Sequence, residues 1–199
     1  DIPLTAEGRR QAQRLAPLLA GVDFGLVLTS PLRRAAETCE LAGLGERAQV
    51  DDGLCEWDYG SFEGLTPDEI RAGSSDWLVF RDGCPGGESP EQVSARIDSI
   101  IARVREVPGD VALFAHGHLS RMFVARWLGL PALAGQHFLL DTATVSVLGY
   151  YYGHAVAEIR WESGTDGWKP RCTKPVPARY YGYPYEYRAT EDQEDRLMF

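Results

Sequence analysis

The sequence predicts an α/β fold in three layers, with a mainly parallel sheet between two layers of helices. Segments typical of strands alternate with segments typical of helices through most of the chain. The clearest strand is the apolar run of residues 111–115, which fits a strand buried on both faces. A helical pattern follows this run at once, and the longest amphipathic stripe of the chain, residues 93–107, precedes it.

Start signals mark the other helices. Thr5 is a suitable N-cap with Glu7 in the first turn, and Pro17 predicts a kink or the start of a short new turn. Residues 66–69 and 89–92 are capping boxes that place a proline at the first helical position, so a helix is expected after each.

Three more strands are expected. Residues 24–28 predict a buried strand, and a helix should follow it with Ser30 as its cap. Residues 137–149 and 155–161 have the pattern of two further strands. The polar pair at 141–142 could line a pocket, but we interpret it as an interruption of the strand.

Composition sets limits on function. Apolar residues make up 44% of the chain and charged residues 25%, as in ordinary globular proteins, and the net charge of −9 argues against nucleic acid or a membrane surface as partner. No apolar segment reaches the roughly 20 residues that span a bilayer, and no signal peptide is recognisable, so a cytoplasmic location is expected. The four cysteines form no C-x-x-C pair, which disfavours a zinc ribbon and a thioredoxin-like motif.

The chain is expected to hold one domain, residues 1–162, and a tail, residues 163–199. The tail is rich in proline and tyrosine, has an acidic end, and shows neither a helical nor a strand period. It should be ordered only if its tyrosines dock on the domain.

Candidate site residues follow two of the predicted strands. Because the carboxyl ends of parallel strands form the ligand crevice, His116 and Gly117 should lie at its rim, where the next helix offers free N–H groups to an anion. Arg33 and Arg34 fall in the first turn of another helix, and cations there favour a bound anion. The alternative is that both arginines pair with surface acids such as Glu37.

A third candidate is Glu56, in a loop rich in aromatic residues, acids and glycines. Its carboxyl group, between Leu54 and Trp57, is either partly desolvated and able to donate a proton near neutral pH, or an ordinary solvated loop glutamate.

Arginine, a carboxylic acid and imidazole together suit phosphoryl transfer. The chain contains neither a Walker loop nor G-x-G-x-x-G, which disfavours nucleotide-dependent reactions.

Four motifs in order resemble the histidine phosphatase superfamily, the phosphoglycerate mutase-like enzymes, over about residues 1 to 162. They are Leu4-Thr-Ala-Glu-Gly, Thr29-Ser-Pro-Leu-Arg-Arg-Ala, Leu54-Cys-Glu-Trp-Asp-Tyr-Gly-Ser-Phe-Glu-Gly and Phe114-Ala-His-Gly-His. The resemblance is greatest to the phosphatase branch related to sedoheptulose-bisphosphatase. It implies a phosphoglycerate mutase-like fold and hydrolysis of phosphomonoesters of small metabolites through a phosphohistidine, without cofactor or metal.

The resemblance also implies roles for individual residues. Arg34, rather than Arg33, would clamp the phosphoryl group, Glu56 would be the proton donor, and His116 would stabilise the transferred group. Tyr59, Gly117 and His118 fall at substrate-contact positions.

One departure from the family is large. The family opens with a strand ending in Arg-His-Gly, whose histidine is the nucleophile, and this sequence contains no such triplet. We therefore expect a phosphatase domain without its first strand, whose loss would leave backbone groups of the neighbouring strands unpaired.

Three alternatives remain: a non-catalytic domain that binds phosphorylated ligands, a phosphoglycerate mutase, and a metal-dependent hydrolase using His116, His118, Asp141 and His154. Homo-oligomerisation is left open.

Overall fold

The computed structural model describes residues 1–151, 153–160 and 197–198. The helices are α1 (Ala6–Gln13), α2 (Ala16–Leu19), α3 (Arg33–Leu41), α4 (Pro67–Gly73), α5 (Val79–Asp82), α6 (Pro90–Val104) and α7 (Gly117–Trp127). The strands are β1 (Phe24–Thr29), β2 (Ala48–Val50), β3 (Asp110–Phe114), β4 (Val145–Tyr151), β5 (His154–Arg160) and β6 (Leu197–Met198). Short 3₁₀ helices span Gly45–Arg47, Asp52–Leu54, Gly60–Phe62 and Ala132–His137.

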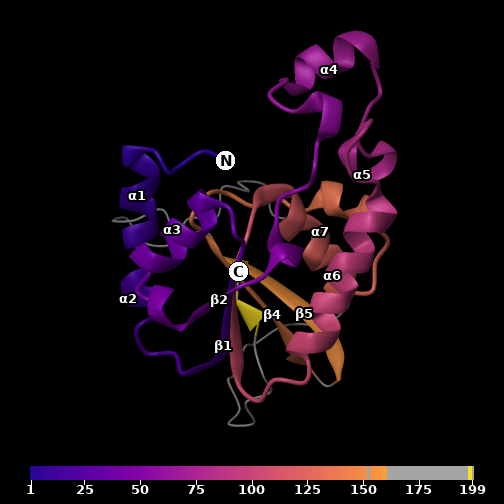
Figure 1. The fold of residues 1–199 in the computed structure, drawn as a ribbon. Coiled ribbons are helices and arrows are strands. Elements are labelled where there is room, and N and C mark those ends of the chain that lie inside the picture. Colours follow the sequence, from indigo (N-terminus) through magenta and orange to yellow (C-terminus); the bar gives the residue numbers. More distant parts are fainter. Residues whose placement is uncertain (152, 161–196, 199) are drawn as a thin grey trace, which may run out of the picture.

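The predicted α/β class and mainly parallel sheet are confirmed. The strand order is β2-β1-β3-β6-β4-β5, in which the β1–β2, β1–β3 and β3–β6 pairs are parallel and the β4–β5 and β4–β6 pairs antiparallel. Figure 1 shows α1, α2 and α3 on one side of the sheet and α5, α6 and α7 on the other. Three layers result, with α4 projecting from the body.

The central strand β3 is buried on both faces, as its apolar run predicts. Val111 and Leu113 pack with α6 and α7 in one core cluster, whereas Ala112 and Phe114 pack with α2 and α3 in the other. Alternate residues of a strand point to opposite faces, so a strand covered on both sides must be apolar throughout. The carboxyl end of β3 is thereby held in the middle of the molecule.

The predicted helix starts are also found. The Thr5 hydroxyl accepts a hydrogen bond from the Gly8 amide, and Thr66 and Ser89 each form a complete capping box. Pro17 lies in the first turn of α2, so it begins a short new helix instead of kinking a long one.

The predicted role of Ser30 as a helix cap is wrong. Helix α3 begins at Arg33 with Leu32 at the N-cap position, and Ser30 is fully buried before the helix. Its hydroxyl accepts a hydrogen bond from the Leu32 amide at 3.2 Å, so it closes a turn between β1 and α3.

The strand predicted from residue 137 is also wrong in its first half. His137 ends a 3₁₀ helix, and β4 begins only at Val145. Asp141 hydrogen-bonds to the Thr142 amide through its side chain and to the Thr144 hydroxyl through its carbonyl oxygen. Such local hydrogen bonds compete with strand pairing and stabilise a loop at this position.

The short strand β6 lies between β3 and β4. Its two residues pair with Val111 and Ala112 of β3 and with Val147 and Leu148 of β4. The rest of the predicted tail, and hence its expected docking through tyrosines, lies outside the described residues. In the part of the chain that the structure describes, no helix has the length and apolar character needed to cross a membrane.

Candidate functional site

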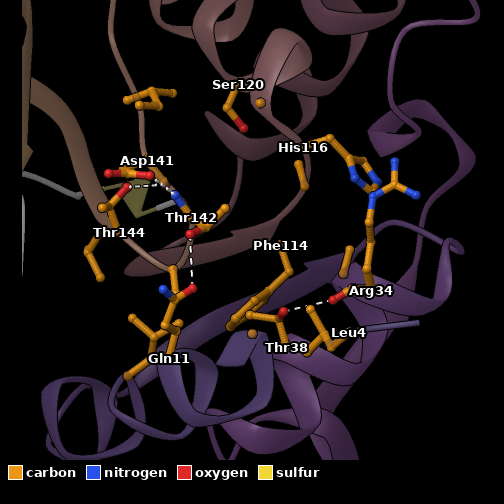
Figure 2. Close-up of a pocket in the computed structure, with 18 of the residues that line it drawn as sticks. Leu4, Gln11, Arg34, Thr38, Phe114, His116, Ser120, Asp141, Thr142 and Thr144 are labelled. Carbon is orange, nitrogen blue, oxygen red and sulfur yellow. Dashed lines mark hydrogen bonds between the residues drawn. The ribbon is translucent and has the colours of Figure 1, made fainter. Parts of the chain in front are cut away.

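A cavity of about 520 Å³ lies between the carboxyl-terminal half of β3 and the start of β4, with α1 and α3 along its wall. Figure 2 shows Arg34 and His116 at one end of it, and Gln11, Thr142 and Thr144 at the other. Glu56 and Gly117 also line the cavity. Residues from all four sequence motifs therefore meet at one cavity.

Arg34 contributes the cationic group of the cavity. Within the described residues, its guanidinium group makes no hydrogen bond or ion pair, whereas Glu37 pairs with Arg9 and accepts a hydrogen bond from the Leu4 amide. Arg33 is exposed and does not line the cavity. Among the described residues, neither arginine therefore pairs with a surface acid such as Glu37, and Arg34 is available to bind an anion.

His116 is the N-cap residue of α7, and its side chain is 7% exposed. Its Nε2 atom lies 2.8 Å from the Ser30 hydroxyl oxygen. Burial lowers the pKa of His116 to about 4, and the positive charge of Arg34 acts in the same direction, against the opposing effect of Glu56. The imidazole is accordingly neutral at neutral pH.

Glu56 is bonded to the start of α7, which has no side-chain cap of its own. The Glu56 carboxylate accepts hydrogen bonds from the His118 amide at 3.2 Å, the Leu119 amide at 2.9 Å and the Trp57 amide at 3.0 Å. An anion at a helix N-terminus is stabilised by the free N–H groups there. Glu56 therefore caps α7 from a distant loop and lies beside His116. The alternative that Glu56 is an ordinary solvated loop glutamate is wrong.

The three predicted substrate-contact residues have different surroundings. Gly117 lines the cavity, but Tyr59 and His118 do not. The Tyr59 hydroxyl lies 2.5 Å from Nδ1 of His118, and burial raises the pKa of Tyr59 and lowers that of His118. Both groups are thus neutral at neutral pH and hold the loop of Glu56 against α7, while their contact with substrate stays a prediction.

The metal-site alternative has no support in the described residues. No group of three or more histidine, cysteine, aspartate or glutamate side chains is placed there to hold a metal ion. Asp141 and Thr142 interrupt the predicted strand, since β4 begins only at Val145, and they also line the cavity, so both interpretations of this pair are confirmed.

Sequence reasoning missed two other residues. Ser30 bonds to His116, and Arg96 bonds to the backbone of the Glu56 loop. A serine shortly after a predicted strand and an arginine within an apolar helical stripe were the available signals.

Stability at acidic pH should depend on His116. Its pKa is lowered by folding from about 6.5, so the unfolded chain binds more protons between pH 6.5 and about 4. The contribution of His116 to the free energy of unfolding is therefore complete above pH 6.5 and declines as the pH falls, by up to about 1.4 kcal/mol per pH unit. Urea unfolding at pH 7 and pH 5 should show a smaller pH dependence for His116→Asn than for the wild type. His137→Asn, at an exposed position, is the matched control and should keep the wild-type dependence.

The arrangement suits binding of a phosphoryl group. A guanidinium group and a neutral imidazole lie at one end of the cavity, and both can donate hydrogen bonds to phosphoryl oxygens. The carboxyl group of Glu56 lies at the same place and can exchange a proton with a bound ester.

Comparison with known proteins gives a consistent assignment. The family described as Histidine phosphatase superfamily (branch 1) matches residues 1–162. An acid phosphatase of Mycobacterium tuberculosis (strain ATCC 25618 / H37Rv) is 42% identical over 157 residues, which are 77% of this chain and 77% of that protein. The sedoheptulose 1,7-bisphosphatase of Saccharomyces cerevisiae (strain ATCC 204508 / S288c) is 33% identical over 162 residues, which are 65% of this chain and 60% of that protein. The solved structure of the open reading frame Rv3214 from Mycobacterium tuberculosis has a TM-score of 0.75 at 41% identity, and the match covers 78% of this chain and 82% of that one.

Proposed function

Because this chain belongs to the histidine phosphatase superfamily, we propose that it provides the phosphoryl-binding and acid–base part of a phosphatase for small phosphorylated metabolites. The observation that carries the proposal is the meeting of Arg34, Glu56 and His116 at one cavity. The acid phosphatase and bisphosphatase relatives support hydrolysis of phosphomonoesters over the mutase alternative. The cytoplasmic location and homo-oligomerisation stay predictions.

Each residue has a distinct role in the proposed reaction. The Arg34 guanidinium group binds two phosphoryl oxygens through parallel N–H donors. His116 donates a hydrogen bond to a third oxygen and reduces the charge that develops there in the transition state. Glu56, which enters the reaction as the carboxylic acid, protonates the departing alkoxide.

The nucleophile in this proposal is a histidine supplied from outside the 199 residues, at the end of an Arg-His-Gly strand. The cavity supports this step because it separates the end of β3 from the start of β4, beyond Ala112 and Val147, the last positions at which β6 pairs with the two strands. A strand that takes the place of β6 between β3 and β4 would extend the pairing to the rim beside His116. The reaction would then proceed through a phosphohistidine that water hydrolyses.

The competing proposal is a domain that binds phosphorylated ligands without hydrolysing them. It uses the same Arg34 and His116 contacts and needs no nucleophile. The absence of Arg-His-Gly from the sequence favours it for this chain alone, and only an activity measurement with the strand supplied separates the two.

Phosphate binding tests the site in the chain as it stands. Isothermal titration with inorganic phosphate or vanadate should detect one site, and Arg34→Ala should weaken binding by about 10- to 100-fold, since a hydrogen bond to a charged group contributes about 1.5–3 kcal/mol. Arg33→Ala is the matched control, because Arg33 is the exposed neighbour in the same helical turn. Equal affinities for the wild type and Arg34→Ala would contradict the proposed site.

A further inference from the structure

Arg96, on α6, is bonded to the backbone of the loop that carries Glu56. Its Nη1 atom donates hydrogen bonds to the carbonyl oxygens of Gly53 at 2.7 Å and Cys55 at 2.9 Å, and Nη2 donates to that of Glu56 at 3.3 Å. The Arg96 side chain is only 19% exposed and does not line the cavity. Its contacts therefore serve the loop and not a bound ligand.

Glu88 completes this arrangement from the other side. Its two carboxylate oxygens accept hydrogen bonds from Nε and Nη2 of Arg96 at 2.8 and 2.9 Å, and one of them also accepts the Asp58 amide at 3.0 Å. The Glu88 amide in turn donates to the Asp58 carbonyl oxygen. The adjacent Gly87 is required for this close approach, because a Cβ atom there would lie 2.2 Å from the same oxygen.

The backbone is therefore held on both sides of Glu56. On one side, Arg96 binds the carbonyl oxygens of Gly53, Cys55 and Glu56 itself. On the other side, Glu88 binds the amide of Asp58, two residues after Glu56. From this backbone the Glu56 carboxyl reaches the first amides of α7, beside His116. A proton donor must lie within hydrogen-bond reach of the leaving oxygen, and a displacement of about 1 Å can reduce the rate about 100-fold.

We propose that Arg96 is a positioning residue that sets the place of the Glu56 carboxyl group, an inference that rests on the proposed role of Glu56 as proton donor. The planar guanidinium group is needed because it serves three carbonyl oxygens and a carboxylate at once, which an ammonium group cannot do in one geometry. Arg96→Lys is the informative variant. This variant keeps the positive charge, which also lowers the pKa of His116. It removes only the planar set of N–H donors of the guanidinium group.

The first test uses the chain as it stands and needs no activity. The Leu119 amide lies in the first turn of α7, where no carbonyl of the same helix can accept it, and it donates to Glu56. In Arg96→Lys, hydrogen exchange of the Leu119 amide should become at least about 10-fold faster, while exchange at Val124, in the middle of α7, should stay unchanged.

Arg126→Lys is the matched control for this measurement. Arg126 makes a similar two-point contact with the Asp98 carboxylate between α7 and α6, away from the Glu56 loop. Its replacement should leave Leu119 exchange unchanged. Unchanged Leu119 exchange in Arg96→Lys would overturn the proposal, as would equal acceleration in both variants.

The second test uses the enzyme completed with an Arg-His-Gly strand. Arg96→Lys should lower kcat for an alkyl phosphate at least about 10-fold more than for p-nitrophenyl phosphate, whose leaving group needs little protonation. When Glu56 is already replaced by glutamine, adding Arg96→Lys should not change the ratio of kcat for the alkyl phosphate to kcat for p-nitrophenyl phosphate any further. Equal loss on both substrates would show a merely structural role and overturn the proposal. If the completed enzyme has no activity at all, the proposed function fails, whereas the exchange measurement still decides whether Arg96 positions Glu56.

Discussion

Joining a strand that ends in Arg-His-Gly to the N-terminus of this chain, for which we expect no measurable phosphatase activity, should turn it into a phosphatase. The Asp1 carboxylate accepts a hydrogen bond from the Arg33 amide, so the N-terminus lies beside the first turn of α3, close to Arg34. A strand ahead of Asp1 could therefore end at the rim where His116 lies. Its histidine would attack phosphorus while Arg34 and His116 bind the phosphoryl oxygens.

The expected change is several orders of magnitude in kcat. Serine proteases that lose their nucleophile keep roughly 10³- to 10⁴-fold of their rate enhancement over water. Phosphate monoesters are among the slowest substrates to hydrolyse without a catalyst. Even if this chain kept a rate enhancement of that size, its rate of hydrolysis would be too low to detect. The chain of 199 residues should consequently hydrolyse p-nitrophenyl phosphate no faster than its His116→Ala variant.

The measurement is release of p-nitrophenol and of inorganic phosphate with a chelator present. The control is the same extended chain with glutamine in place of the strand histidine, which should be inactive. An acid-labile phosphorylated enzyme should accumulate only when the histidine is present. Turnover by the chain without the strand, abolished by the chelator, would instead support a metal-dependent hydrolase.

Replacing Glu56 by glutamine in the completed enzyme should separate substrates by their leaving groups. Glutamine keeps an oxygen that can accept a hydrogen bond from the start of α7, but it cannot donate a proton to the departing alkoxide. We expect kcat for a sugar phosphate or alkyl phosphate to fall by about 10²- to 10⁴-fold, the usual contribution of general acid catalysis. The loss for p-nitrophenyl phosphate should be much smaller, because p-nitrophenolate leaves without protonation.

The matched control for Glu56→Gln is Glu63→Gln. Glu63 lies on the same loop and accepts a hydrogen bond from the Tyr59 amide, but it does not line the cavity. This variant should leave both rates near the wild-type values. Equal losses of kcat on both substrates in Glu56→Gln would show that Glu56 is not the proton donor. Its role would then be only that of a helix cap.

Local patterns were sufficient for most elements of the fold. The capping boxes at Thr66 and Ser89 begin helices as predicted, because each depends on hydrogen bonds between residues three positions apart. The run of residues 111–115 predicted a buried strand for a similar reason, since a strand covered on both faces has no polar position. The strand predicted from residue 137 failed because the local hydrogen bonds of Asp141 stabilise a loop there.

The sequence by itself determined which residues could form the site: an arginine in the first turn of a helix, a histidine after the central strand and an acid in a glycine-rich loop. Only the tertiary structure decided what each of them contacts. Ser30 bonds to His116 across 86 positions of the chain, and Glu56 caps α7 from 63 positions away. The physical reason is that such contacts depend on the register of β1 and β3 and on how the Glu56 loop packs against α6, and neither leaves a periodic signal in the sequence.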